Sequence, residues 1–171
     1  ELFRTSRSAT RTVDSTLTIG DTTIQYRFPE VGDVASSEKG DLKGARATSG
    51  RRINVVVTSP PGHSNQRFAI RNTWTKDQNV LFVLLGGSWE DIEEEFLEHG
   101  DMVWVKESAS VDKGALTVIL DQVGFDAMAK KYGSDYDYIF STPDDGFVFV
   151  REAQVLLGDS PGDFWGVCEV D

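Results

Sequence analysis

The sequence predicts an α/β fold in which a mostly parallel sheet carries helices on both faces. Two observations predict it. From residue 53 onward, short apolar runs rich in β-branched residues alternate with segments of helical periodicity. Glycine and proline residues punctuate the points where these runs would end. Strands that alternate with helices favour a parallel sheet, because each helix returns the chain to the same end of the sheet.

The predicted strands of this sheet are short apolar runs, at residues 53–58, 80–85, 102–105 and 137–141. The first two runs are almost continuously apolar, which is typical of strands covered on both faces. A further short extended piece is expected at residues 147–150.

Helical segments are expected between and after these strands, over about residues 64–74, 88–100, 116–133 and 152–157. The second begins at Ser88 with the acid Asp91 three residues later, which resembles a capping box. Gly100 and Gly133 follow the second and third segments, in the position where a helix commonly ends in a left-handed residue.

The first 50 residues have a different character. Residues 1–16 are rich in Ser, Thr and Arg and predict a flexible lead-in. Residues 17–28 alternate apolar and polar side chains around Gly20 and Asp21, which predicts a β-hairpin. The Gly- and Ser-rich stretch that follows indicates a linker. The sequence therefore divides into residues 1–50 and an α/β domain over residues 51–171.

The charge balance limits the classes of ligand. The chain has 171 residues and a net charge of −11, which argues against a nucleic-acid binder. The excess of acid lies entirely in residues 51–171, where 21 Asp and Glu face ten Lys and Arg. A phosphorylated ligand would therefore need a metal cation or well-placed arginines there. Cys168 is the single cysteine, so no internal disulfide can form.

Two adjacent acids follow the last predicted strand. In open parallel sheets ligands bind beyond the carboxyl ends of the strands, which here indicates Thr58 and Ser59, the glycines at 86–87, and residues 142–146. Asp144 and Asp145 suit a hard divalent cation that is shared with phosphate. The same residues also fit a plain polar turn.

Arg67 and Arg71 lie four residues apart, on one face of the first predicted helix. Guanidinium groups match phosphate or a nucleotide carbonyl. The alternative is an exposed helix face on which both arginines pair with carboxylates. His63 is isolated and is expected at the surface. The sequence contains no P-loop, no G-x-G-x-x-G motif and no Cys/His cluster.

Several blocks, taken in order, resemble the β1,3-galactosyltransferase-type family, glycosyltransferase family 31. Residues 67–74 read R-F-A-I-R-N-T-W, which is similar to the family block R-x-A-I-R-x-T-W. Residues 82–86 resemble its F-L-L-G strand, and residues 95–103 resemble its E…Y-G-D-I segment. Residues 138–150 align with F-V-x-K-T-D-D-D-x-F-V-x-V. The resemblance covers about residues 53–157.

The resemblance implies a GT-A-type, Rossmann-like fold and inverting, Mn²⁺-dependent transfer of a hexose from a UDP-sugar to an acceptor hydroxyl, in β1,3 linkage. By position, Asp145 matches the metal ligand, and Asp144 matches an acid near the ribose. Thr58 and Arg67 match positions of the nucleotide pocket, and Arg71 matches a further motif position on the donor side. The acceptor would be a glycan or glycoprotein. Family members are usually Golgi membrane proteins with a lumenal catalytic domain, so a membrane anchor would precede Glu1.

The chain departs from the family pattern at several points. Pro143 stands where the first acid of the motif is expected. The general base and the acceptor-binding half of the fold are expected beyond Asp171, so the chain is expected to be the donor-binding half and no catalytic base is assigned. One alternative is a non-catalytic relative with an eroded metal site. Another is an unrelated doubly wound module that binds phosphate through the loop after its first strand, without Asp145.

Overall fold

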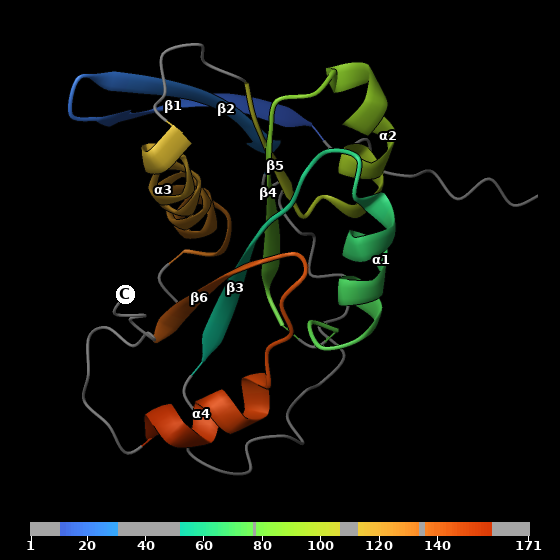
Figure 1. The fold of residues 1–171 in the computed structure, drawn as a ribbon, viewed down its shortest axis with the longest axis vertical. Helices are drawn as coiled ribbons and strands as arrows, with labels where there is room; N and C mark the ends of the chain where they lie inside the picture. The colour runs from blue at the N-terminus through green and yellow to red at the C-terminus, as the bar shows by residue number, and fades with distance from the viewer. Residues whose placement is uncertain (1–10, 31–51, 77, 107–112, 134–135, 159–171) are drawn as a thin grey trace, which may run out of the picture.

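The computed structural model describes residues 11–30, 52–76, 78–106, 113–133 and 136–158 (Figure 1). These residues form one six-stranded sheet and four helices. In chain order the elements are β1 (Thr12–Ile19), β2 (Thr22–Pro29), β3 (Ile53–Thr58), α1 (Ser64–Asn72), β4 (Val80–Leu85), α2 (Trp89–His99), β5 (Met102–Val105), α3 (Lys113–Tyr132), β6 (Tyr138–Pro143) and α4 (Val150–Gly158). The predicted alternation of strands and helices is confirmed from β3 to β6.

The strand order of the sheet is β1-β2-β5-β4-β3-β6. Strands β5, β4, β3 and β6 are parallel, and β1 and β2 form an antiparallel hairpin that joins the sheet beside β5. The fold is therefore α/β with a mixed, mostly parallel sheet. The chain builds outward from β3 in one direction and then crosses to β6 on the other side. Such a reversal of strand order opens a crevice at the carboxyl ends of the two strands on either side of it, here β3 and β6.

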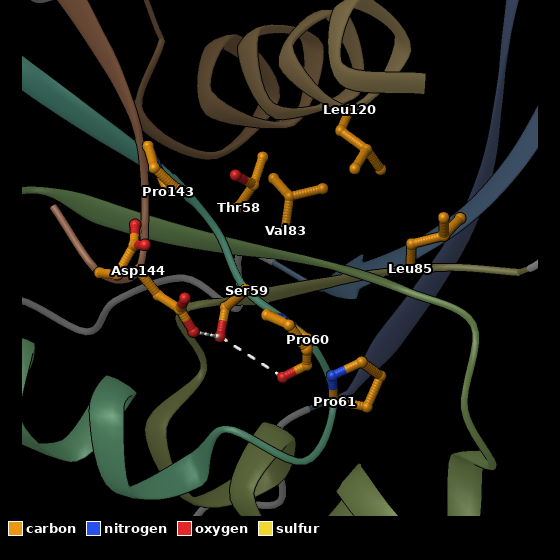
Figure 2. Close-up of a pocket in the computed structure, with 10 residues that line it drawn as sticks. Thr58, Ser59, Pro60, Pro61, Val83, Leu85, Leu120, Pro143 and Asp144 are labelled. Atoms are coloured by element: carbon orange, nitrogen blue, oxygen red, sulfur yellow. Dashed lines mark hydrogen bonds between the residues drawn. The ribbon is translucent and has the colours of Figure 1, made fainter. Parts of the chain in front are cut away.

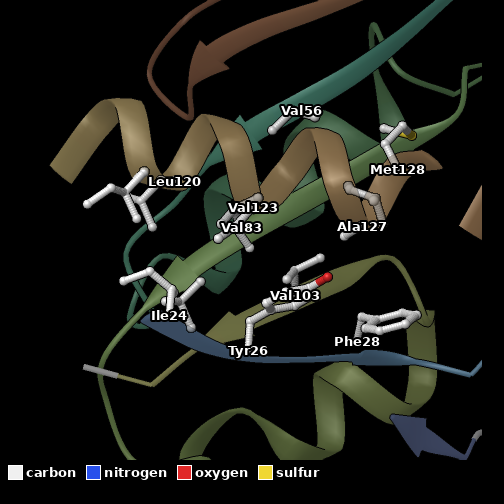
Figure 3. Close-up of a cluster of buried hydrophobic side chains, with 13 residues drawn as sticks. Ile24, Tyr26, Phe28, Val56, Val83, Val103, Leu120, Val123, Ala127 and Met128 are labelled. Carbon is white, nitrogen blue, oxygen red and sulfur yellow. The ribbon is translucent and has the colours of Figure 1, made fainter. Parts of the chain in front are cut away.

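Helices cover both faces of the sheet, as the sequence predicts. Helices α1 and α2 lie on one face and α3 on the other (Figure 1). The core under α1 and α2 is built from alternate strand residues such as Val55, Val57 and Phe82. The intervening residues point to α3, where Val56, Val83 and Val103 pack with the hairpin, among others (Figure 3). This alternation is the two-residue period of a strand, applied to a sheet that is apolar on both faces.

Helix α3 approaches the sheet closely at Gly124. A Cβ atom built on Gly124 would lie 2.4 Å from Val56 Cγ1 and 3.1 Å from Val83 Cγ2. Glycine is unfavourable inside a helix, so this position is explained by the close contact with β3 and β4.

The hairpin is longer than the sequence predicts. Residues 12–16, expected to belong to a flexible lead-in, form the first part of β1. Val13 packs against the α3 core together with Leu17 and Ile19, and the alternate residues Thr12, Asp14, Thr16 and Thr18 are exposed. Val13 is the one apolar side chain in that stretch, which is too little for a periodic signal. Residues 1–10 and 31–51, which include the predicted linker, lie outside the described part.

The segment expected to be extended at residues 147–150 is not a strand. Residues 146–149 have no regular structure, and Val150 already begins α4. Val148 and Val150 pack on Ile53 in a small separate core, whereas Phe147 and Phe149 are exposed. The segment is therefore irregular, with one side buried and the other exposed. Within the described residues no helix has the length and apolar character needed to span a membrane.

Candidate functional site

A pocket of about 400 Å³ lies where β3 and β6 end, on the α3 side of the sheet (Figure 2). Its lining comes from four elements and the loops after them: Thr58 at the end of β3 with Ser59 to Pro61 after it, Val83 and Leu85 of β4, Leu120 of α3, and Pro143 at the end of β6 with Asp144 and Asp145 after it. Thr58 is the register partner of Pro143, so the ends of the two strands lie side by side. The pocket therefore occupies the place that the strand-order rule indicates.

Three of the predicted site residues line this one pocket, namely Thr58, Asp144 and Asp145. Asp145 is exposed on the turn after β6. The turn itself is well formed, because Gly146 N donates to Pro143 O at 3.1 Å. The polar-turn interpretation of Asp144 and Asp145 is therefore confirmed, and the turn presents both acids at the pocket.

The carboxylate of Asp144 is held by the loop after β3. Its Oδ2 accepts a hydrogen bond from Ser59 Oγ at 2.7 Å and lies 2.9 Å from His63 Nδ1. The side chain of Asp144 is 8% exposed, and that of His63 is 44% exposed. A buried carboxylate against Nδ1 fixes the orientation of an imidazole and leaves Nε2 for an outside partner. This side of the pocket can therefore form hydrogen bonds with polar groups.

Arg67 is fully buried and uses every hydrogen-bond donor of its guanidinium. Nε and Nη2 donate to the two carboxylate oxygens of Glu95 at 2.9 and 2.7 Å. Nη1 donates to Ser59 Oγ and Pro60 O, and Nη2 also donates to Pro61 O. Five N–H groups thus meet five acceptors, which is the full capacity of an arginine. Arg67 therefore fixes the wall residues Ser59, Pro60 and Pro61 and has no N–H left for a ligand.

Arg71 lies away from the pocket. Its Nε and Nη2 donate to both oxygens of Asp101 at 2.7 and 2.8 Å, and Nη1 donates to Glu95 at 2.7 Å. Burial would raise the pKa of Glu95, but hydrogen bonds from Arg67 and Arg71 bring that pKa below its ordinary value. The expectation that carboxylates pair with both arginines is confirmed. The expectation that they do so on an exposed face is wrong, because α1 turns this face toward α2.

His63 is the residue that the sequence interpretation missed. It lies on the surface as expected, but it bonds to Asp144, which is 81 residues away in the chain. Among the described residues, the carboxyl-edge rule could have found it, since His63 ends the loop that leaves β3 and directly precedes α1.

The carboxylates at the pocket suit a metal ion only if a bound ligand supplies part of its coordination. Within the described residues, no group of three or more His, Cys, Asp and Glu side chains is arranged to hold a metal. A closed protein site for a divalent cation is therefore not formed there. Mg²⁺-like ions, however, are commonly held by one or two carboxylates together with the phosphates of a ligand. The exposed carboxylate of Asp145, beside Asp144, fits such a shared site.

Comparisons of the chain with protein-family models, with curated proteins and with solved structures find no match.

Proposed function

We propose that the chain is the donor-binding part of a glycosyltransferase that transfers a hexose from a UDP-sugar to an acceptor hydroxyl. The observation that carries the proposal is that Asp144 and Asp145 line one pocket with Thr58, at the carboxyl ends of β3 and β6. These are three of the five residues that the family resemblance assigns to the donor site, the other two being Arg67 and Arg71. The proposal extends the α/β fold to a GT-A-type fold, in which this crevice holds the nucleotide.

The roles of the residues follow from their surroundings. The exposed carboxylate of Asp145 would hold Mn²⁺, which would neutralise the diphosphate and stabilise the charge of the leaving nucleotide. Asp144 already binds Ser59 and His63, so it positions the loop and offers its remaining oxygen, Oδ1, to a ribose hydroxyl. Arg67 fixes the wall at Pro60 and Pro61 without touching the ligand.

The reaction on this proposal is an inverting displacement. The acceptor oxygen bonds to the anomeric carbon, the bond from that carbon to UDP breaks, and the acceptor hydroxyl proton passes to a base that we do not assign. The β1,3 linkage, a glycan or glycoprotein acceptor, and action on the lumenal side of the Golgi membrane belong to the same proposal. They rest on the resemblance alone.

A non-catalytic binding domain is the second candidate, and two observations favour it. Pro143 stands in the position of the first acid, and within the described residues every N–H of the Arg67 guanidinium already has an acceptor. Both reduce the number of groups that could act on a donor diphosphate. A domain of this kind would keep the pocket but would bind a nucleotide weakly or not at all.

Calorimetric titration of UDP into the full chain, with and without Mn²⁺, tests the proposal. We expect metal-dependent binding that Asp145→Asn weakens by about tenfold or more, since a lost metal ligand should cost at least as much as a lost supporting residue. Glu94→Gln, which removes one exposed acid on α2, is the charge-matched control and should bind as the parent chain does.

Two outcomes would contradict the proposal. Absence of UDP binding by a chain with a cooperative unfolding transition would favour the non-catalytic domain. Binding that needs no metal, survives Asp145→Asn and is lost in Thr58→Val would favour a nucleotide-binding module unrelated to glycosyltransferases.

A further inference from the structure

A second and larger cavity, of about 660 Å³, lies on the opposite face of the sheet, at its hairpin edge. Its principal side chains are Asp14, Thr16, Gln25 and Arg27 from the hairpin, Trp104 from β5 and Trp89 from α2. We call it the hairpin cleft. The hairpin extends away from α2, so this helix lies over only the β5 end of the hairpin face (Figure 1).

The floor of the hairpin cleft is a polar surface produced by strand alternation. Ile24 and Tyr26 of β2 are buried toward α3, so Gln25 and Arg27 face the cleft. Across the sheet, Thr16 pairs with Gln25, and Arg27 pairs with both Asp14 and Trp104. Two rows of side chains that can form hydrogen bonds therefore run across neighbouring strands, and the row of Asp14 and Arg27 continues to the indole of Trp104.

The wall of the cleft consists of two tryptophans that are only partly buried. The rings of Trp89 and Trp104 lie 5.5 Å apart at 51°. Each is held in place, since Trp104 Nε1 donates to Gly86 O at 2.8 Å and Trp89 packs edge-on against Phe96 at 5.1 Å. Trp104 thus presents part of its ring to the cavity. A rigid aromatic surface of this kind offers contact area at little cost in conformational entropy.

Arg27 links the polar floor to the aromatic wall. Its guanidinium lies 4.5 Å from the centre of the Trp89 ring, and its Nε and Nη2 donate to the Asp14 carboxylate at 2.6 and 3.0 Å. Within the described residues, Nη1 makes no hydrogen bond and can donate to a ligand. The stack on Trp89 also means that a second cation has no free access to that ring face.

We propose that the hairpin cleft binds a saccharide through a pyranose ring. One face of a pyranose is a patch of C–H bonds, which packs against an indole, and its rim carries hydroxyls that both donate and accept. The cleft supplies that combination, with Trp104 for the C–H face and Arg27 Nη1, the Gln25 amide and the Thr16 hydroxyl for the rim. Asp14, Arg27 and Lys106 line the cleft, and Glu93 acts on Arg27 from nearby, so charges of both signs are present. The cleft therefore suits a neutral ligand that is recognised through its hydrogen bonds.

The inference does not depend on the proposed function, because the two cavities lie on opposite faces of the sheet. The test uses the full chain and two disaccharides, lactose and chitobiose, observed by saturation-transfer NMR and by tryptophan fluorescence. Sorbitol is the control ligand, since it carries similar hydroxyls but no ring face. We expect binding by at least one disaccharide, with a change in tryptophan emission, and no effect of sorbitol.

Variants assign the binding to the cleft. Gln25→Ala removes an exposed side chain and should weaken binding by about fivefold, the value of one hydrogen bond of about 1 kcal/mol. Thr23→Ala, on the same face of the hairpin but outside the cleft, should change nothing. Asp145→Asn should also leave saccharide binding intact, whatever it does to UDP.

Absence of disaccharide binding by the folded chain would overturn the proposal. An equal response to sorbitol would overturn it as well, and so would binding that Gln25→Ala and Trp89→Ala both leave unchanged.

Discussion

Replacement of the buried Arg67 tests the central structural claim about the pocket. In Arg67→Met the methionine fills much of the same space but removes five hydrogen bonds, to Glu95, Ser59, Pro60 and Pro61. Breaking a buried ion pair from one side costs about 3–5 kcal/mol. Because Glu95 keeps its bond to Arg71, we expect the lower part of that range, about 3 kcal/mol.

Urea denaturation measures this loss directly. With a slope of about 2 kcal/mol per molar, a loss of about 3 kcal/mol moves the midpoint down by roughly 1.5 M. Arg67→Lys should lose nearly as much, since an ammonium cannot reproduce the planar fork between Glu95 and the loop. A double-mutant cycle with Glu95→Gln should give a coupling free energy of more than about 1 kcal/mol.

The alternative, that Arg67 contacts the nucleotide, predicts a different pattern. Arg67→Lys would then leave the urea midpoint unchanged and would weaken UDP binding. A midpoint shift below about 0.3 M for Arg67→Met, well short of the cost of breaking a buried pair, would refute the structural role of the Arg67 guanidinium.

Three further predictions concern stability. Gly124→Ala should lower Tm by roughly 4–8 °C, because the added methyl group overlaps Val56 and overpacking costs about 2 kcal/mol; an unchanged or higher Tm would contradict the close contact of α3. Burial lowers the pKa of Lys131 from 10.5 to about 8, so the unfolded state binds more protons and stability should rise between pH 8 and 10.5, a rise that Lys131→Met should abolish in urea midpoints. Burial raises the pKa of Tyr132 from 10.0 to about 12, so stability should fall between pH 10 and 12, and Tyr132→Phe should remove that fall.

The parallel part of the fold could be predicted because its signals are local. Each strand from β3 to β6 is a short apolar run, and Gly100 and Gly133 end their helices with positive φ, as expected. The place of the hairpin was not predictable in this way. Its alternation shows that one face is buried, but not that β2 pairs with β5 through Tyr26 and Val105. That pairing joins segments almost eighty residues apart.

The candidate site, too, has residues that local signals predict and residues that they do not. The acids after β6 and Thr58 after β3 could be predicted, because a general rule places ligands at the carboxyl ends of strands. The burial of Arg67 could not, since its position in the helix does not show that Glu95 approaches from α2. The bond between His63 and Asp144 likewise depends on β3 and β6 being neighbours, which only the strand order reveals.

The fully bonded guanidinium of Arg67 also determines how the pocket can behave when a ligand arrives. Ser59, Pro60 and Pro61 cannot leave their places unless bonds to a buried charge are broken, so this wall is as rigid in the empty pocket as in the filled one. A ligand therefore loses little free energy to ordering on this side, and its association should not wait for a slow rearrangement of the loop. Adaptation to ligands of different size falls instead to the exposed turn at Asp145.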